Sequence, residues 1–410
     1  MAAATTDQLR RLNTAKVLRS LRESGPASRA ALAKRTGLAK ATVGTIVAEL
    51  HRVHAVQERP VPSSVPTSVP TSKLAIKPAI KPTSGRPGRP VALDGAVTVG
   101  LGLEVNVEYV AATALDLAGR TVLSRRLPTE AGDELGALTE LAHDCRRQLA
   151  GEGRHLVGIE VAVPGLVDRS RGVVVAAPNL GWQGLDLAGA VAGSVADAGG
   201  GAIRVRVDND ANCSALAEAT FGVARGVDQV LYLTGTVGLG AGLIVDGVVQ
   251  RGSNGFAGEV GHLPVGNANR RCACGRRGCW ETTVGLRAML RATHRQSTGD
   301  PVDLASDIAR LARTDPAVRA AVRELAGWLG TGISTLAGVL DPAMVVLGGY
   351  FVPLGPLVVP VVERSLRRGL LATGSRCCTV ALSTLGLHAA SAGAATDVLA
   401  EVFDGTLALT

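Results

Sequence analysis

The chain has 410 residues, of which 46% are hydrophobic and 19% are charged, and its net charge is +8. This length predicts two or three domains, and the composition is that of a globular protein. No apolar run of about 18 residues is free of charges, and the N-terminus lacks the apolar core of a signal peptide, so we expect a cytoplasmic protein without a membrane span. Aromatic residues make up only 2%, which argues against a stacking platform for single-stranded nucleic acid.

The charge is distributed unevenly along the chain. Residues 1–90 contain sixteen Lys and Arg but only four Asp and Glu, a net charge of +12, whereas the remaining 320 residues carry −4. A basic N-terminal region on a mildly acidic remainder indicates that the N-terminal region contacts a polyanion. A solvated basic tail would have the same charge, so charge alone leaves both interpretations open.

The N-terminal region predicts three helices. Leucine and valine at helical spacing indicate a first helix that ends at Gly25, before Pro26. Ser28 can cap a second helix, "RAALAKR", and Gly37 makes the turn into a third, within "TGLAKATVGTIVAEL". The apolar residues of the first helix are Leu9, Leu12, Val17, Leu18 and Leu21.

The second and third helices have the spacing of a helix-turn-helix. The framework is a small residue, a glycine turn and two apolar anchors: Ala33, Gly37, Val43 and Ile46. We expect the packed face to consist of Leu32, Leu38, Val43, Ile46 and Leu50. The outward residues that could enter the major groove of an operator in double-stranded DNA are Lys40, Ala41, Thr42 and Thr45, and the expected phosphate contacts are Arg29, Lys34 and Arg35. Any three-helix bundle has similar periodicity, so the periodicity alone does not indicate DNA binding. The basic charge of residues 1–90 provides the additional support.

A proline-rich segment follows the helices. Residues 61–72 are the tandem repeat "VPSSVPTSVPTS", and "AIKPAIKP" repeats behind it, which predicts an extended segment over 60–84. We interpret "RVHAVQE" and "RPVALD" on either side as two strands of a wing, which completes a winged helix-turn-helix domain over residues 1–95. The "GRPGRP" stretch could instead be an arginine hook for the minor groove, or a plain basic linker.

From residue 96 to the end, strands and helices alternate. "VGIEVAVPGLVD" predicts a buried strand, "IRVRVDNDANCSALAEATFG" a strand that opens a helix at a polar cluster, and "QVLYLTGTVGLGAGLIVDGVVQRG" two strands around a glycine-rich turn. This order predicts an α/β architecture with functional residues at the ends of strands.

Three cysteines lie within eight residues in "GHLPVGNANRRCACGRRGCWE", which runs from Gly261 to Glu281. Their spacing, C-x-C-x4-C, with a histidine ten residues upstream, is typical of metal ligands, and clustered thiols in a reducing compartment bind metal more often than they pair. A zinc finger that reads DNA and a metal clip that shapes another site are both possible, and free cysteines or a redox pair are further alternatives. The cluster lies about 170 residues beyond the basic region, which disfavours the finger.

Seven stretches resemble the ROK family of sugar-responsive repressors and sugar kinases. They are "VPGLVD", "APNLGW", "VDNDANCSALAE", "GLGAGLIVDG", "GFAGEVGH", "CACGRRGCWE" and "VVLGG". The resemblance implies a two-lobed actin/hexokinase-like (RNase H-like) sugar-kinase fold over 96–410, with the lobe boundary near residue 210 and a C-terminal helix that returns to the first lobe. The basic helix-turn-helix resembles the family's repressor branch, which includes repressors that respond to xylose and N-acetylglucosamine.

The same resemblance implies a site. Its four metal ligands, for a closed structural Zn²⁺ without an open position, would be His262, Cys272, Cys274 and Cys279. Its sugar contacts would be Asn179, Asn209, Asp210, Glu259, His262 and Glu281. Asp210 stands where the family's kinases keep the base that deprotonates the sugar hydroxyl, although "DND" on a loop is also an ordinary helix cap.

The phosphate loops distinguish a kinase from a sensor. Kinases of the family resemble one another in a first loop of the form D-x-G-G-T-K, but this chain has "GLEVNVEY": Glu104 replaces the aspartate, and Asn106 and Val107 replace glycines. Glu108 adds like charge, and in the second loop Val237 replaces a hydroxyl residue. We therefore expect no enzyme but a sugar-responsive repressor, a homodimer or tetramer. A sugar kinase with a DNA-binding head and an interaction protein with a vestigial sugar site are the alternatives.

Overall fold

The computed structural model describes residues 6–58, 89–196, 201–236, 238–295, 300–369, 378–407 and 409. The chain divides into two compact units. The first unit comprises Met1–Thr98, Asp116–Arg120 and Ala400–Thr410, and the second comprises Val99–Leu115 and Thr121–Leu399. Within the described ranges, no helix is both long and apolar enough for a membrane crossing.

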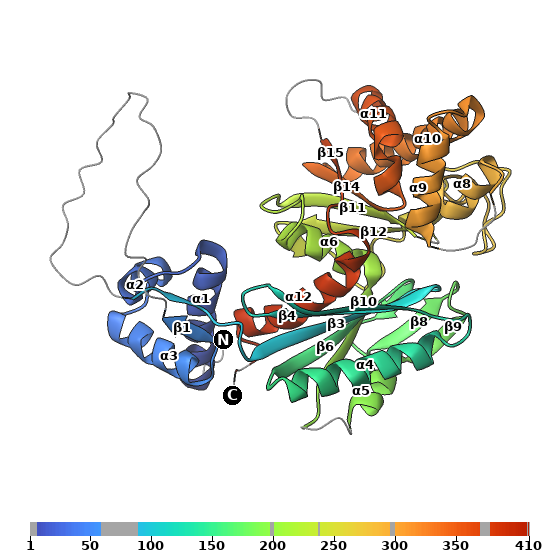
Figure 1. Ribbon diagram of the computed structural model, residues 1–410. Helices are drawn as coiled ribbons and strands as arrows, with labels where there is room; N and C mark the ends of the chain where they lie inside the picture. The colour runs from blue at the N-terminus through green and yellow to red at the C-terminus, as the bar shows by residue number, and fades with distance from the viewer. Residues whose placement is uncertain are drawn as a thin grey trace, which may run out of the picture. The chain divides into compact units, whose positions relative to one another are not determined.

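The first unit contains the three predicted helices and a two-stranded sheet (Figure 1). Its elements are α1 Thr6–Ser24, α2 Arg29–Thr36, α3 Lys40–Arg52, β1 Val56–Glu58 and β2 Val91–Leu93. Ser28 caps α2, because its Oγ accepts a 3.3 Å hydrogen bond from the Ala31 N–H. Gly37 ends α2 with a φ of 72°, a left-handed conformation that glycine adopts without a Cβ penalty. The two predicted strands pair antiparallel, with Val56 opposite Leu93.

The core of the first unit contains most of the residues predicted for it. Leu32, Val43, Ile46 and Leu50 are buried, whereas Leu38 is half-buried. On α1, Val17, Leu18 and Leu21 are buried. Leu9 and Leu12 are 51% and 50% exposed, because only the C-terminal half of α1 packs against the other elements of the core. The predicted extended segment, 60–84, and the first four residues of "GRPGRP" lie outside the described residues.

The first sheet of the second unit has the strand order β10-β6-β3-β4-β5. Its strands are β3 Thr98–Val105, β4 Tyr109–Asp116, β5 Thr121–Pro128, β6 His155–Val163 and β10 Val205–Asn209. Strands β3 and β4 are buried along their whole length, because helices cover both faces. One face packs against α4 Glu134–Gly151 and α5 Leu187–Ala196. A three-stranded antiparallel sheet, β7 Leu166–Asp168, β8 Val173–Ala177 and β9 Trp182–Asp186, follows β6.

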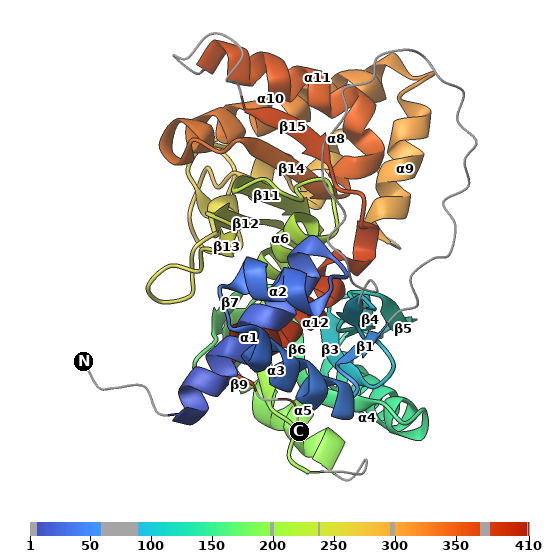
Figure 2. The same cartoon turned by 90° about the vertical axis from the view of Figure 1, so that its left-hand side faces the viewer.

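The second sheet has the order β13-β12-β11-β14-β15 and is also mixed. Its strands are β11 Gln229–Gly235, β12 Leu239–Val245, β13 Val248–Val249, β14 Met344–Gly349 and β15 Thr379–Leu382. The helices α10 Pro316–Leu340 and α11 Phe351–Gly369 cover its outer face (Figure 2). The smaller elements of this lobe are η1 Val260–His262, α7 Glu281–Val284, α8 Leu286–Ala292, α9 Pro301–Leu311 and η2 Gly386–His388.

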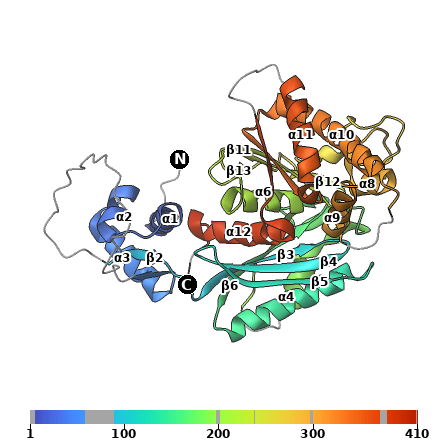
Figure 3. The same cartoon turned by 45° about the horizontal axis from the view of Figure 1, so that its top comes forward.

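Two helices lie between the sheets, α6 Asp210–Thr220 and α12 Ala389–Asp404 (Figure 1). Figure 3 shows α12 along the face of the first sheet that is opposite α4. The approach is close, because a Cβ on Gly100 would lie 3.0 Å from the Ala395 carbonyl oxygen. A Cβ on Gly102 would collide with the backbone of Ser391, and one on Gly393 with the backbone of Cys213 in α6. Glycine at these positions therefore packs α12 directly against β3 and α6.

Candidate functional site

The six residues expected to contact a sugar line one cavity of about 360 Å³ in the second unit. They are Asn179, Asn209, Asp210, Glu259, His262 and Glu281. They come from four stretches of the chain, and Asn179 and Glu281 both lie within 4.0 Å of the position that a Cβ on Gly238 would occupy. The cavity wall also includes Thr234, Thr236 and Arg276, which sequence reasoning did not single out. The cavity thus combines carboxylates, amides and an imidazole.

Asn209 and Asp210 are placed by the end of β10. Strand β10 runs parallel to β6, with Asn209 opposite Val163, so the carboxyl ends of both strands meet at one edge of the sheet. Asn209 is the N-cap of α6, and its Oδ1 accepts hydrogen bonds from the N–H groups of Ala211 at 2.9 Å and Asn212 at 3.2 Å. Its Nδ2 donates to the Gly165 carbonyl at 3.1 Å. The capping role and the cavity position therefore belong to the same residue, and most of its amide is already hydrogen-bonded.

Two carboxyl groups of the cavity, those of Asp210 and Glu259, have raised pKa values. Burial raises the pKa of Asp210 to about 6, a backbone hydrogen bond from Ala211 opposes the rise, and the charge of Glu259 adds to it. Burial also raises the pKa of Glu259, where His262 opposes the rise and Glu281 adds to it. A carboxyl group that titrates near neutrality can accept a proton at physiological pH, so the geometry would allow Asp210 to act as a base.

The four predicted metal ligands are brought together beside the cavity. The ligand atoms of His262, Cys272, Cys274 and Cys279 all lie within 4.8 Å of one another. The Cys274 and Cys279 sulfurs are 3.5 Å apart, and Cys272 Sγ is 3.7 Å from His262 Nδ1. These thiols are not joined in disulfides, and the separations match the edges of about 3.7 Å that follow from Zn–S bonds of about 2.3 Å in a tetrahedron. The group could hold a metal ion.

The peptide around the metal cluster is held by local turns and one buried anchor. Gly275 and Gly278 adopt φ values of 86° and 73°, which allow the chain to fold back between the cysteines. Trp280, next to Cys279, is fully buried, and its Nε1–H donates a 3.0 Å hydrogen bond to the Trp328 carbonyl of α10. Glu281 then opens α7 and accepts a 3.0 Å hydrogen bond from the Cys272 thiol. His262 and Cys274 of the cluster therefore line the cavity, and Glu281 of the cavity is hydrogen-bonded to the cluster.

The turn between β3 and β4 carries the residues expected in place of a phosphate loop, and the amide hydrogens of Asn106 and Val107 are used within the turn. The Asn106 N–H donates to the Tyr109 carbonyl at 2.8 Å, and the Val107 N–H donates to Asn106 Oδ1 at 2.8 Å. Both residues line the cavity. In the other loop, Val237 lies outside the described residues, while Gly238 and Gly240 line the cavity.

The residues expected to contact DNA lie in the first unit. Those that are exposed are Arg29, Lys34, Arg35, Lys40, Ala41 and Thr45, and Thr42 is half-buried. Arg29 forms a 2.7 Å ion pair with Glu58 in β1, so part of its charge is neutralised within the unit. The Ala39 N-cap of α3 makes no side-chain hydrogen bond, as its apolar side chain requires.

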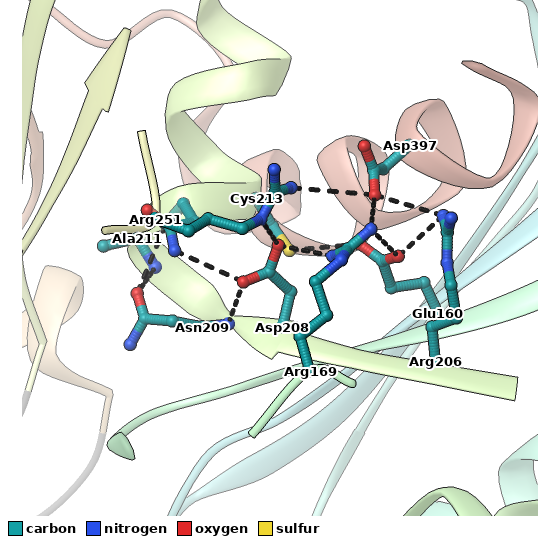
Figure 4. A network of polar contacts seen from close by, with 10 residues as sticks. Glu160, Arg169, Arg206, Asp208, Asn209, Ala211, Cys213, Arg251 and Asp397 are labelled. Atoms are coloured by element: carbon teal, nitrogen blue, oxygen red, sulfur yellow. Dashed lines mark hydrogen bonds and ion pairs between the residues drawn. The ribbon is translucent and has the colours of Figure 1, made fainter. Parts of the chain in front are cut away.

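Sequence reasoning missed a group of buried and half-buried charged residues next to Asn209 (Figure 4). Its members are Glu160, Arg169, Arg206, Asp208, Arg251 and Asp397. Asp208 stands in the quoted "VDNDAN" stretch and could have been considered with its neighbours. The other members are scattered over more than two hundred residues, and no local pattern connects them.

Comparisons with known proteins agree with this architecture. The model of the ROK family matches residues 100–401. The chain is 27% identical over 402 residues to the xylose repressor of Bacillus subtilis (strain 168), a match that covers 97% of each. It is 30% identical over 314 residues to a glucokinase of Streptomyces coelicolor, covering 72% of this chain and 96% of the glucokinase.

Two solved structures show the same difference between a regulator and a kinase in how much of this chain they match. A crystal structure of a ROK family transcriptional regulator, a homolog of the E. coli MLC protein, matches with a TM-score of 0.76 and 25% identity over 97% of both chains. A ROK family glucokinase from Streptomyces griseus, in complex with glucose and AMPPNP, matches with a TM-score of 0.61 and 29% identity over 73% of this chain and 98% of the glucokinase. The regulators thus match nearly the whole chain, whereas the kinases match about three quarters of it.

Proposed function

The chain belongs to the ROK family, and from this premise we propose that it is a sugar-responsive transcriptional repressor whose kinase-like unit binds a sugar without phosphorylating it. The observation that carries the proposal is the extent of the matches: a xylose repressor covers 97% of the chain, basic N-terminal region included, whereas a glucokinase covers 72%. A repressor acts on chromosomal DNA, so this function would require the predicted cytoplasmic location.

The first unit is the proposed DNA-binding head, a winged helix-turn-helix over residues 1–95. Its support is the α2–turn–α3 geometry with the left-handed Gly37 and the antiparallel β1–β2 pair, which has the place of a wing. Helix α3 would enter the major groove with Lys40, Thr42 and Thr45 near base edges. Two heads on a homodimer with a two-fold axis would read a roughly palindromic operator.

The cavity is the proposed effector site, and the metal cluster beside it a structural Zn²⁺ site. Carboxylates and amides accept and donate the hydrogen bonds that adjacent sugar hydroxyls require. Three cysteines and a histidine supply the four ligands of a closed zinc site. Zinc would fix the ring of His262 through Nδ1, leaving Nε2 for a hydroxyl, and would hold the segment that carries Glu281.

The lack of phosphorylation is supported by the turn after β3. Phosphate loops bind anions through free backbone N–H groups, but the N–H groups of Asn106 and Val107 are already hydrogen-bonded within the turn. The β-branched side chain of Val107 also faces the cavity. An ATP phosphate would have to break these bonds and approach the buried Glu104 carboxyl group.

A sugar kinase with a DNA-binding head is the second candidate. It is favoured by one observation: Asp210, at the family's base position, is buried with its pKa raised to about 6. The test of both candidates uses the full-length protein. DNA binding to its own upstream region is measured by fluorescence anisotropy with and without D-xylose and D-glucose, and ADP production is measured with the same sugars. A sugar-dependent change in DNA affinity without ADP supports the repressor, whereas sugar-dependent ADP that Asp210→Asn abolishes supports the kinase.

A further inference from the structure

Six titratable side chains form a network next to Asn209, a residue of the cavity wall (Figure 4). We refer to them as the charge network: Glu160 of β6, Arg169 after β7, Arg206 and Asp208 of β10, Arg251 after β13, and Asp397 of α12. Glu160 is fully buried and Asp208 is 3% exposed. The three arginines and Asp397 are half-buried. Charges removed from water to this degree are costly unless they are paired, which constrains the geometry of the group.

Asp208 connects the network to the cavity. Its Oδ1 accepts hydrogen bonds from the Asn209 N–H at 2.8 Å and from Asn212 Nδ2 at 3.2 Å. These bonds hold the junction of β10 and α6, where Asn209 and Asp210 face the cavity. Its Oδ2 accepts from Arg169 Nη1 at 2.6 Å and from Arg251 Nε at 2.7 Å. One carboxylate thus holds the cavity residues on one side and two guanidinium groups on the other.

Asp397 connects the same guanidinium groups to α12. Arg169 Nη2 is paired with Asp397, and Arg206 Nη2 lies 3.1 Å and Arg251 Nη2 3.7 Å from its Oδ2. Burial alone would raise the pKa of Asp397, but the three guanidinium charges outweigh burial and lower it. The Asp397 carboxylate is therefore ionised and held by arginines from three different segments.

Arg169 and Arg251 each span two carboxylates. Both contact Asp208 of β10 and Asp397 of α12. A guanidinium group is planar with fixed donor directions, so a bridge of this kind transmits a change in position rather than absorbing it. A shift of the β10–α6 junction when a ligand binds would therefore displace Asp397, or would break a buried ion pair.

Helix α12 is suited to move as one body. A Cβ at Gly102 or Gly393 would collide with the backbone of Ser391 or Cys213, so α12 approaches β3 and α6 closely at these two points. The helix continues without interruption to Asp404, and its residues from Ala400 onward belong to the first unit. In that unit the guanidinium of Arg22 lies 4.6 Å from the centre of the Phe403 ring, and Arg19 donates to the Phe403 carbonyl. Both arginines are on α1 of the proposed head.

We propose that the charge network positions α12 according to the occupancy of the effector cavity, and that α12 conveys this state through Phe403 to α1 and so to DNA affinity. The inference rests on the proposed repressor function. Asp397, Arg169 and Arg251 are positioning residues: they do not line the cavity, and their effect is on the coupling between sugar and DNA rather than on either binding event alone.

The experiment measures two equilibria on the full-length protein: the dissociation constant for D-xylose or D-glucose by calorimetry, and that for the upstream DNA with and without saturating sugar. We expect the sugar to change DNA affinity by about tenfold in the wild type. Asp397→Asn and Arg251→Gln should each keep sugar affinity within about threefold but reduce the change in DNA affinity to less than about twofold. Phe403→Ala, at the C-terminal end of α12, should also keep sugar affinity and reduce the change in DNA affinity.

Glu363→Gln is the matched control, because Glu363 is an exposed carboxylate on α11 that lies 3.9 Å from Arg367; it should behave like the wild type. If the wild type itself shows no effect of sugar on DNA binding, the repressor function fails. If the wild type responds and the three variants respond equally, the repressor stands and the coupling route is wrong. If the variants lose sugar affinity, the network only shapes the cavity, and the inference is overturned. Should Asp397→Asn not fold, Arg251→Gln and Phe403→Ala still decide.

Discussion

The hydroxyl group of Tyr109 donates a 2.6 Å hydrogen bond to Oε1 of Glu104, and both side chains are buried at the turn between β3 and β4. The second carboxyl oxygen of Glu104 is buried without a hydrogen-bond partner. The resemblance to the family's kinases would give an acidic residue at this position a role toward the metal–phosphate group. In this chain the acidic side chain is directed to a neighbouring tyrosine, and burial raises its pKa to about 7 although the Tyr109 hydrogen bond opposes the rise.

Glu104→Gln should stabilise the protein at pH 8 and not at pH 4. In the unfolded chain the carboxyl group ionises near 4.5, whereas in the folded protein it keeps its proton until about pH 7. The unfolded state therefore loses the proton first, and stability falls as the pH rises between these values. Glu104→Gln removes this loss and should raise the free energy of unfolding at pH 8 by at most about 3 kcal/mol, at about 1.4 kcal/mol per pKa unit. Denaturant unfolding at both pH values measures it.

Glu363→Gln, which changes an exposed carboxylate, should alter the unfolding free energy little at either pH. An equal effect of Glu104→Gln at both pH values would mean that the pKa of Glu104 is the same in the folded and unfolded states, which would contradict the raised pKa.

The purified protein should contain about one zinc ion per chain, by analogy with closed four-ligand sites. Cys274→Ser should lose the metal, and sugar binding should weaken with it, because His262 of the cluster lines the cavity and Glu281 of the cavity is hydrogen-bonded to the cluster. Metal analysis by mass spectrometry measures the first effect and calorimetry the second. Cys378→Ser is the matched control, since Cys378 lies outside the cluster. A zinc-free wild type would contradict the site, whereas full sugar affinity in zinc-free Cys274→Ser would contradict only the coupling.

Glu259→Ala should weaken sugar binding by roughly 1–3 kcal/mol, because it leaves sugar hydroxyl groups unpaired in the cavity. Asn209→Ala should weaken binding too, but it also removes the N-cap of α6, so about 1 kcal/mol of stability would be lost as well. Asn209→Asp retains a capping oxygen but loses the hydrogen bond from Nδ2 to the Gly165 carbonyl, so comparing its stability with that of Asn209→Ala isolates the contribution of the cap. Unchanged sugar affinity in Glu259→Ala would place the effector elsewhere.

Thr42→Ala and Lys34→Ala should weaken DNA binding in different ways. Thr42 lies on the first turn of α3, and its loss should relax sequence preference by about 1–3 kcal/mol if it contacts a base. Lys34 is exposed at the end of α2, and its loss should weaken all sequences alike and reduce the salt dependence by about one ion. A salt titration on upstream and random DNA measures both.

Arg29→Ala provides the comparison for Lys34→Ala, because the ion pair with Glu58 already neutralises part of the Arg29 charge; its effect on the salt dependence should be smaller. If DNA binding does not weaken with salt and shows no sequence preference, the proposed DNA-binding role of the first unit is wrong and its N-terminal region is only a basic tail.

Features that depend on neighbours in the sequence could be predicted from the sequence alone. Ser28 and Gly37 delimit α2 because capping and a left-handed turn are local to a few residues. The metal cluster could be predicted because its ligands lie within 18 residues, from His262 to Cys279, and short turns bring them together. The strand that runs into α6 follows from an apolar stretch and an Asn cap in succession.

Tertiary structure decided what depends on contacts between distant residues. No local pattern relates Asp397 to Asp208, because their connection requires α12 to pack on β3 and α6. That packing depends on Gly102 and Gly393, which lie far apart in the sequence. The exposure of Leu9 and Leu12 follows from which half of α1 packs against the rest of its unit. The internal use of the Asn106 and Val107 amides follows from the closed turn between two paired strands. Helical periodicity and residue type specify a face or a cap, but only the assembled fold specifies which partner each face meets.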